Sequence, residues 1–383
     1  MISFDLTETQ RAVRDMAEDF AQAEIAPHAL AWDEAKQLPV EVLRRAAALG
    51  MAGIYTGTEH GGSALGRLEA VLIFEALARG CPTISAFLSI HNMATWMVDS
   101  FATKDLRAAL VPSLVTMERI ASYCLTEPGS GSDAAALATR AQRDGDHYIV
   151  NGTKQFISGA GLSDLYVTMV RTGAEGATGI SALVIPKDTP GLSFGANERK
   201  MGWHAQPTRT VTFDGCRVPA ANLLGAEGNG FRIAMKGLDG GRLNIAATSL
   251  GGAAGALEKT LAYMSEREAF GKKLQDFQAL QFRIADMATK VEASRALLYA
   301  AAAAFDRGDP QATAGAAMAK RFVTDTCFEV VDEALQLHGG YGYLAEYGME
   351  KLVRDLRVHR ILEGTNEIMR LIISRALLKE MGQ

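Results

Sequence analysis

The chain has 383 residues, 48% of them hydrophobic and 22% charged, and its 39 Lys and Arg against 44 Asp and Glu give a formal net charge of −5. This length allows two or three domains, and the composition is that of an ordinary globular protein and not of a disordered or fibrous one. The mild acidity disfavours proteins that bind nucleic acids or anionic membranes, because such binding relies on dense clusters of Lys and Arg.

Cysteine usage and the ends of the chain bear on the compartment. The four cysteines lack the spacing of a zinc site or of a dense disulfide framework, so we expect a reduced, intracellular compartment. The N-terminal segment MISFDLTETQ shows no targeting signal, and the C-terminal segment LLKEMGQ shows no peroxisomal or lipidation signal. The uncharged stretch 80–98 contains Pro82 and His91, which predicts a buried helix pair and not a membrane span.

The first 118 residues are predicted to form a helical domain. Residues 7–10 have the spacing of a capping box, and apolar residues then recur at helical intervals up to Phe20. Further helices are expected over 41–49 and 68–78, on either side of a Gly-rich turn at 57–62.

Residues 119–230 are predicted to form a compact β domain. Asn151-Gly152 lies between two β-prone runs, which is typical of a hairpin. Short strands are expected over 165–170, 180–185 and 210–213, with Asp214-Gly215 closing the last one.

Residues 231–383 are predicted to be helical again. Leu280, Ile284, Met287, Val291 and Leu298 form one apolar stripe at helical spacing. Residues 307–310 interrupt this helix, another helix is expected over 312–338, and the last begins near Thr365. The order α, β, α predicts an α+β protein with a C-terminal helical bundle that also makes subunit contacts.

Generic catalytic motifs are absent. No segment has the full dinucleotide-binding fingerprint, a Walker A sequence, a G-x-S-x-G elbow or an H-x-x-x-H pair, so no metal site is expected.

Three local groups remain as candidates. The loop 123–133 could hold a phosphate or a flavin edge, or be a plain β-turn. Arg267 near Phe277-Gln278 could clamp a pyrophosphate, or be a surface arginine at an interhelical turn. Glu363 could be a general base held against apolar neighbours, or an exposed glutamate.

Taken together, these groups and other segments resemble the acyl-CoA dehydrogenase family over essentially the whole chain. The matching segments are 123–133, 152–158, 239–245, 267–278, 336–342, 354–355 and 363–367. The resemblance implies an N-terminal helical domain (1–118), a middle β-barrel-like or β-sandwich domain (119–230) and a C-terminal four-helix bundle (231–383), with FAD between them. It also implies a homotetramer, a dimer of dimers, in which a neighbouring subunit contacts each flavin, and electron-transferring flavoprotein as the electron acceptor.

The resemblance also implies roles for individual residues. From the β domain, the flavin would be lined by Tyr123, Thr126, Gly131, Ser132, Phe156 and Ser158. The partner subunit's FAD would be reached by Arg267, Phe277, Gln278, Gln336 and Gly340, and Thr365 and Glu367 would complete the cofactor pocket. The CoA thioester would be met by Ser132, Asp239, Arg242 and Arg375. Phe156 departs from the Trp of many members, which keeps an aromatic wall but loses the indole donor.

Catalysis is assigned by the resemblance to Glu363, which would remove the substrate's α-proton while a hydride leaves the β-carbon. Some members carry the base just before the arginine that Arg242 matches, but this chain has Gly241 there, so we expect Glu363 to be the sole base. Gly240, Gly241 and Gly364 are expected where the backbone approaches the cofactor, the CoA or the base.

Substrate size is indicated by segments 89–93, 206–209 and 357–364, which favour the members that convert isobutyryl-CoA to methacrylyl-CoA in valine breakdown. Leu362 replaces a Tyr of several straight-chain enzymes, although it could also be ordinary core packing. The alternatives 2-methylbutyryl-CoA and butyryl-CoA stay open, because pockets discriminate single methylenes by only roughly 1–3 kcal/mol. More remote alternatives are an acyl-CoA oxidase and a non-enzymatic flavin-binding member. The expected location is the cytoplasm of a prokaryote or, as a mature form, the mitochondrial matrix of a eukaryote.

Overall fold

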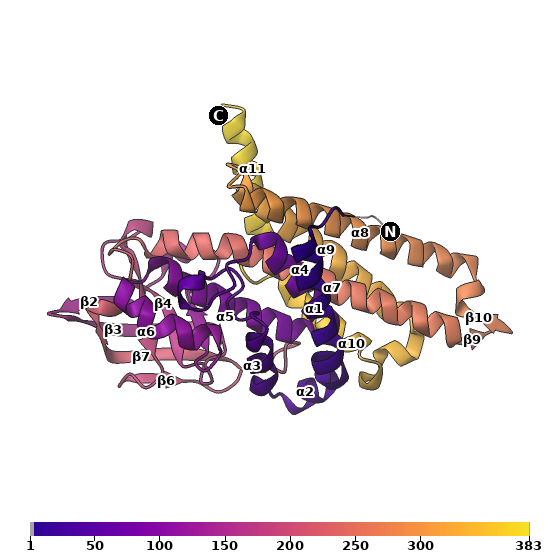
Figure 1. The fold of residues 1–383 in the computed structure, drawn as a ribbon, viewed down its shortest axis with the longest axis horizontal. Helices are drawn as coiled ribbons and strands as arrows, with labels where there is room; N and C mark the ends of the chain where they lie inside the picture. The colour runs from indigo at the N-terminus through magenta and orange to yellow at the C-terminus, as the bar shows by residue number, and fades with distance from the viewer. Residues whose placement is uncertain (1–3, 383) are drawn as a thin grey trace.

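The computed structural model describes residues 4–382, in which a β-sheet lies at one end of the molecule and long helices form the rest (Figure 1). The α-helices are α1 Glu8–Phe20, α2 Ala29–Ala35, α3 Val40–Ala48, α4 Arg67–Gly80, α5 Pro82–Phe101, α6 Lys104–Val115, α7 Gly230–Glu266, α8 Gln278–Asp306, α9 Ala312–Leu337, α10 Met349–Arg357 and α11 Asn366–Glu380. The strands are β1 Ala121–Cys124, β2 Arg140–Asp144, β3 His147–Ser158, β4 Leu165–Arg171, β5 Ile180–Pro186, β6 Leu192–Phe194, β7 Thr208–Pro219, β8 Leu223–Leu224, β9 Glu268–Ala269 and β10 Lys272–Lys273. This order confirms the expected α+β class. The predictions about targeting signals include residues 1–3 and 383, which lie outside the described residues.

The N-terminal helices pack around α4 and α5. The capping box at α1 is confirmed, because the Thr7 hydroxyl accepts from the Gln10 N–H at 3.2 Å and the Gln10 side chain accepts from the Thr7 N–H at 3.0 Å. The expected helix pair over 80–98 was wrong, since α5 is one continuous helix. Pro82 stands at its first turn, where no N–H donor is needed, and no Gly or Pro follows before Phe101 to divide it.

The middle domain is built on one eight-stranded sheet with the order β6-β7-β3-β2-β4-β5-β8, and β1 pairs with β4 in parallel. The hairpin expected at Asn151-Gly152 was wrong, because β3 runs through this dipeptide, and β7 likewise runs through Asp214-Gly215. The two strands pair with a register shift at this point, and the Gly215 N–H donates to Asn151 Oδ1 at 2.8 Å. The dipeptides therefore form an irregularity in two paired strands, and the chain reverses instead at Gly145, between β2 and β3.

The C-terminal helices are organised around α9, which contacts α7, α8, α10 and α11. Met287, Val291 and Leu298 of the expected apolar stripe are buried in the largest hydrophobic core. The 37-residue helix α7 also crosses α4 and α5, so it joins the N-terminal helices to the bundle. Gly251 lies at the crossing with α4, where an added Cβ would stand 2.1 Å from the carbonyl oxygen of Glu75.

Helix α10 is fixed to the sheet domain through the buried carboxylate of Asp355. Its Oδ1 accepts from the Trp203 N–H at 2.7 Å, and its Oδ2 accepts from Lys351 Nζ at 2.5 Å and from the Thr83 hydroxyl at 2.9 Å. Burial alone would raise the pKa of Asp355, but Lys351 and these donors outweigh it and lower the pKa. One carboxylate thus joins the sheet domain, α5 and α10, and α10 leads directly into the segment that carries Glu363.

No helix within residues 4–382 is long and apolar enough to cross a membrane. Across the same residues no group of three or more His, Cys, Asp or Glu side chains is placed to hold a metal ion. The four cysteines are buried and unbonded to one another.

The glycine at the α4–α7 crossing gives a stability prediction. Gly251→Ala is expected to lower the free energy of unfolding by about 1–3 kcal/mol, because the new methyl group meets a backbone atom that cannot rotate away. The matched control is Gly315→Ala on α9, where an added Cβ meets nothing within 4 Å and the better helix propensity of Ala stabilises by up to about 1 kcal/mol. Calorimetric melting of both variants is the measurement, and equal shifts would contradict the packing argument.

Candidate active site

Glu363 lies in the segment between α10 and α11, in a backbone conformation that side chains seldom adopt. Its φ is 54° and that of Gly364 is 90°, so two successive residues are left-handed. Such a conformation costs about 1–3 kcal/mol for a non-glycine residue and persists only where the surroundings impose it. Here Lys320 of α9 donates to the Gly364 carbonyl at 2.8 Å, and Thr365 caps α11 by accepting from the Ile368 N–H at 3.3 Å.

The carboxylate of Glu363 is held against α7 without a hydrogen-bond partner for Oε2, which is buried. Oε2 lies 2.4 Å from where a Cβ on Gly241 would stand, so any larger residue at 241 would displace the carboxylate. Burial raises the pKa of Glu363 to about 7, and the cations of Lys320, Arg242 and Arg67 limit the rise. A carboxyl group that titrates near neutral pH can act as a general base.

Two arginines face Glu363 from different parts of the chain. Arg242, on α7, pairs with Asp239 at 2.5 Å, while its Nε is buried and unpaired. Arg67, at the start of α4, stacks on the ring of Tyr55 at 3.7 Å, and its Nη1 is also buried and unpaired. Both guanidinium groups are therefore held in place while keeping a hydrogen-bond donor without an acceptor.

Further unpaired polar atoms belong to the neighbours of these residues. The hydroxyl of Tyr123, on β1, is buried without a partner, and both Glu363 and Arg242 influence its pKa, which burial raises. Asn244 donates to the Tyr55 hydroxyl at 3.3 Å and leaves its Oδ1 buried and unpaired. Buried polar groups are paired in most native proteins, so this concentration of free donors and acceptors indicates a site for a polar ligand.

An apolar cluster lies on the other side of the Glu363 segment. Leu362 packs with Val358 against the buried side chains of Ala86, Trp203 and Ile245. The residue before the base is thus anchored in a hydrophobic cluster to which α5, the sheet domain and α7 contribute.

The loop 125–133 is held by a buried ion pair. Lys154 Nζ donates to Glu127 at 2.7 Å and to the Leu125 carbonyl at 3.1 Å, and Glu127 also accepts from two backbone N–H groups at Ala138 and Thr139. The Gln155 N–H donates to the Thr126 carbonyl at 2.8 Å, which fixes this loop beside β3.

Phe156 is the exposed aromatic residue of the same region. A second register shift between β3 and β7 falls at Lys154–Ile157, and Phe156 has a φ of 59° with 63% of its surface exposed. Gly131 and Ser132, on the loop 125–133, are also exposed, and a Cβ at Gly131 would meet nothing within 4 Å. Phe156 therefore presents an open aromatic face next to the strand that supports this loop.

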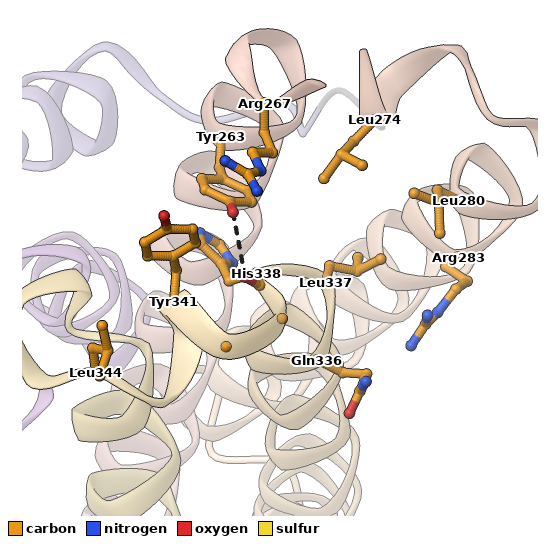
Figure 2. Close-up of a pocket in the computed structure, with 12 residues that line it drawn as sticks. Tyr263, Arg267, Leu274, Leu280, Arg283, Gln336, Leu337, His338, Tyr341 and Leu344 are labelled. Atoms are coloured by element: carbon orange, nitrogen blue, oxygen red, sulfur yellow. Dashed lines mark hydrogen bonds between the residues drawn. The ribbon is translucent and has the colours of Figure 1, made fainter. Parts of the chain in front are cut away.

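A second group of predicted site residues lines a separate cavity of about 420 Å³ (Figure 2). Arg267, Gln336 and Gly340 line it together with Tyr263, His338 and Tyr341, and the Arg267 guanidinium lies 5.3 Å from the centre of the Tyr341 ring. Phe277 and Gln278 begin α8 next to the lining residues Leu274 and Leu280.

The predicted site residues therefore lie mainly in three places: around Glu363, on the loop 125–133 with Phe156, and at the cavity of Arg267. Around Glu363 the structure assembles Tyr123, Asp239 and Arg242, with Thr365 at the adjoining helix start. The cavity of Arg267, Gln336 and Gly340 shares no lining residue with this group. Arg375 is exposed on α11, about 15 Å along the helix from its start, and Glu367 is exposed in its first turn.

Sequence reasoning missed Arg67, Tyr55, Lys320 and Asn244. Arg67 and Lys320 are charged side chains that are almost completely buried, and each stands in an apolar, helix-forming segment. A single charged residue within an apolar helical segment can indicate a buried charge, but the same pattern is typical of a helix with one solvated face.

The comparisons with known proteins agree with this geometry. Family models described as the N-terminal, middle and C-terminal domains of acyl-CoA dehydrogenase match residues 7–118, 122–216 and 228–378. The chain is 55% identical over 379 residues to isobutyryl-CoA dehydrogenase, mitochondrial, of Dictyostelium discoideum (99% of this chain, 91% of the relative), and 52% identical over 378 residues to the protein of that name from Bos taurus, with the same coverage.

Solved structures show the same fold. A chain from work on the electron transferring flavoprotein of Acidaminococcus fermentans superposes with a TM-score of 0.95 at 41% identity, covering 98% of this chain and 100% of that one. Butyryl-CoA dehydrogenase from Megasphaera elsdenii gives 0.95 at 36% identity with the same coverage. The protein belongs to the acyl-CoA dehydrogenase family and is an FAD-dependent oxidoreductase.

The residues present fit FAD and an acyl-CoA thioester. The exposed ring of Phe156 offers a wall for a flavin, and the unpaired Tyr123 hydroxyl and Arg242 Nε offer hydrogen bonds to polar ligand atoms. The cavity beside Arg267 is open over Gly340, where an added Cβ would meet nothing within 4 Å.

The raised pKa of Glu363 gives a prediction about stability. Between about pH 4.5 and pH 7 the folded protein holds a proton on Glu363 that the unfolded chain has lost, so the free energy of unfolding falls as pH rises through this window. Glu363→Gln is a neutral isostere and escapes this loss. Its melting temperature minus that of the wild type is therefore expected to increase from pH 4.5 to pH 7 and to level off above.

Thermal melts of wild type and Glu363→Gln across this range are the measurement, with the exposed Glu118→Gln as the control variant. A difference for Glu363→Gln that is the same at every pH would show that the buried carboxyl does not titrate there.

Proposed function

We propose that the protein dehydrogenates isobutyryl-CoA to methacrylyl-CoA, a step of valine catabolism, with Glu363 as the base. The observation that carries the proposal is the buried, unpaired Oε2 of Glu363, on a carboxyl group with a pKa raised to about 7. This atom faces α7 at Gly241, and the preceding residue Leu362 packs in an apolar cluster.

The chemistry follows from the position of the base. Glu363 removes the proton from the α-carbon of the thioester, and its backbone N–H donates to the thioester oxygen, where negative charge develops. FAD supplies the acceptor for the hydride that leaves the β-carbon. Asp239 holds Arg242 at 2.5 Å so that its unpaired Nε is available to the substrate, and Ser132 is a further proposed thioester contact. Arg375, which the resemblance also assigns to the thioester, is exposed in the third turn of α11 and is left out of this proposal.

The acyl group is inferred from two observations. The two relatives of 55% and 52% identity bear the name isobutyryl-CoA dehydrogenase. Leu362, next to the base in sequence, packs against the buried apolar cluster of Ala86, Trp203 and Ile245, and we propose that this apolar surrounding suits a short branched acyl group. Electron-transferring flavoprotein is the proposed electron acceptor, supported by the 41% identical chain from work on such a flavoprotein.

We further propose that each FAD is shared between two subunits of a homotetramer, a dimer of dimers. Tyr123, Thr126, Gly131, Phe156 and Ser158 would hold it on one subunit, and the cavity of Arg267, Gln336 and Gly340, with Phe277 and Gln278 beside it, on the other, because no residue of the first group lines this cavity. Thr365 and Glu367 would approach it at the start of α11. Exposed Phe270 and Phe282 lie on the elements that carry or adjoin this cavity, as expected for surfaces covered on assembly. The location proposed is the prokaryotic cytoplasm, or the mitochondrial matrix in a eukaryote.

The substrate proposal is tested by adding isobutyryl-CoA to the purified flavoprotein without oxygen and following bleaching of the flavin. Rapid bleaching is expected, slower with 2-methylbutyryl-CoA and butyryl-CoA, and reoxidation should be faster with electron-transferring flavoprotein than with O₂. Glu363→Gln should keep its flavin and bleach at least about 100-fold more slowly, because a general base contributes about 10²–10⁴-fold. No bleaching with any short acyl-CoA would refute the dehydrogenase, and fast reaction with O₂ would favour the oxidase.

Shared flavin binding predicts a distinct phenotype for Arg267→Met. The variant is expected to lose flavin on dilution while Glu363 and its neighbours are unchanged, since Arg267 belongs to the separate cavity. Arg217→Met is the control, because Arg217 forms an exposed ion pair with Asp144 on the sheet. Flavin absorbance after gel filtration, with the mass of the eluting species, is the measurement. Full flavin retention by Arg267→Met would remove this cavity from the cofactor site.

A further inference from the structure

Lys320 is a fully buried ammonium group beneath the Glu363 segment. It stands on α9 within an alanine-rich stretch, and its side chain has 0% exposure. Its Nζ donates to the Gly364 carbonyl at 2.8 Å and to Asn366 Oδ1 at 2.9 Å. Both acceptors lie within three residues of the base, on the turn that begins with the left-handed Glu363.

We propose that Lys320 is a positioning residue for the dehydrogenation: its hydrogen bonds hold the turn that presents Glu363, and its positive charge favours the ionised form of the carboxyl group. The inference rests on the proposed function, in which Glu363 is the base.

The network around Lys320 shows why the turn is rigid. The side chain of Asn366 donates to the Thr324 hydroxyl at 3.0 Å and to Asp325 Oδ1 at 2.9 Å, so its orientation is set and its Oδ1 is turned to Lys320. Two successive left-handed residues would relax without such anchors. The lysine therefore connects the middle of α9 to the backbone immediately after the base.

Anchoring the turn through hydrogen bonds would need only a neutral donor, so the positive charge of Lys320 calls for a second explanation. Burying an ammonium group costs free energy unless it is paired, and burial lowers the pKa of Lys320 to about 8, with Glu363 as the carboxylate that most opposes this shift. A buried cation of this kind at the base indicates an electrostatic role in addition to anchoring.

The other charged and titratable groups near Glu363 come from four parts of the chain. Arg242 approaches from α7, Arg67 from α4, Tyr123 from β1 and Tyr55 from the segment before α4. Asp325 and Glu367 face Lys320 itself. Among the three cations, Lys320 opposes the burial of Glu363 most strongly. Without it, Arg242 and Arg67 remain, and the pKa of Glu363 should rise further.

The test compares the pH dependence of flavin reduction by isobutyryl-CoA in wild type, Lys320→Met, Lys320→Gln and Lys320→Arg. We expect the acid limb of the pH profile to move up by about one pH unit in the Met and Gln variants. Below the limb these variants should reduce flavin up to about tenfold more slowly than the wild type, and above it their rates should approach the wild-type plateau. Lys320→Gln keeps an N–H donor for the turn, and Lys320→Arg keeps the charge and should keep the wild-type limb. A merely structural role would lower the rate equally at every pH.

A second readout does not depend on turnover. Infrared difference spectra identify the protonated carboxyl stretch that Glu363→Gln removes, and its pH midpoint should shift upward in Lys320→Gln. If Lys320→Met fails to retain flavin, the comparison of Lys320→Gln with Lys320→Arg tests the inference. An unshifted midpoint and acid limb in Lys320→Gln, or a shifted limb in Lys320→Arg, would overturn the inference while wild-type bleaching leaves the proposed function standing. Wild-type protein that no short acyl-CoA bleaches would refute both.

Discussion

A carboxylate held in a buried site without a hydrogen-bond partner is the constraint on which the rest of this structure depends. Burying a charge is costly, and here the cost is reduced by three cations placed around Glu363 and not in contact with its free oxygen. The left-handed backbone at Glu363 and the absence of a side chain at Gly241 are both needed to bring that oxygen against α7. Burial thus raises the pKa of the carboxyl group to about 7, and Oε2 keeps no hydrogen bond that would compete with a substrate proton.

The long helices explain how distant parts of the chain meet at one atom. Arg67 comes from α4, Arg242 from α7, Lys320 from α9 and Tyr123 from the sheet, while α10 delivers the base itself. Asp355 couples α10 to the sheet domain and to α5, so the segment before Glu363 is anchored on both sides. Rigid elements, not loops alone, thus define the geometry of the site.

The sequence allowed prediction of the α+β class and most helix positions, because capping residues and helical periodicity are local signals. The role of Glu363 as the base came from the resemblance to a family and stays a prediction. It did not allow prediction of the strand path at Asn151-Gly152, where tertiary pairing of β3 with β7 outweighs the turn preference of the dipeptide. Glycine placement was partly anticipated: Gly241 does lie against the base, but Gly240 makes room for the chain's own Arg67. Arg67 and Lys320 escaped notice because burial of a charge depends on contacts between residues far apart in sequence.

The four buried thiols can report local unfolding of the chain through the rates at which they are labelled. Cys81 lies at the start of α5, Cys124 and Cys216 in the sheet domain and Cys327 on α9, and all four have 0% exposure. Burial raises the pKa of Cys124 and Cys327 to about 12, so alkylating reagents meet almost no thiolate while the fold is closed. The rate at which each thiol becomes labelled therefore measures how often its own region unfolds, and a ligand that stabilises one domain before the others will slow labelling there first.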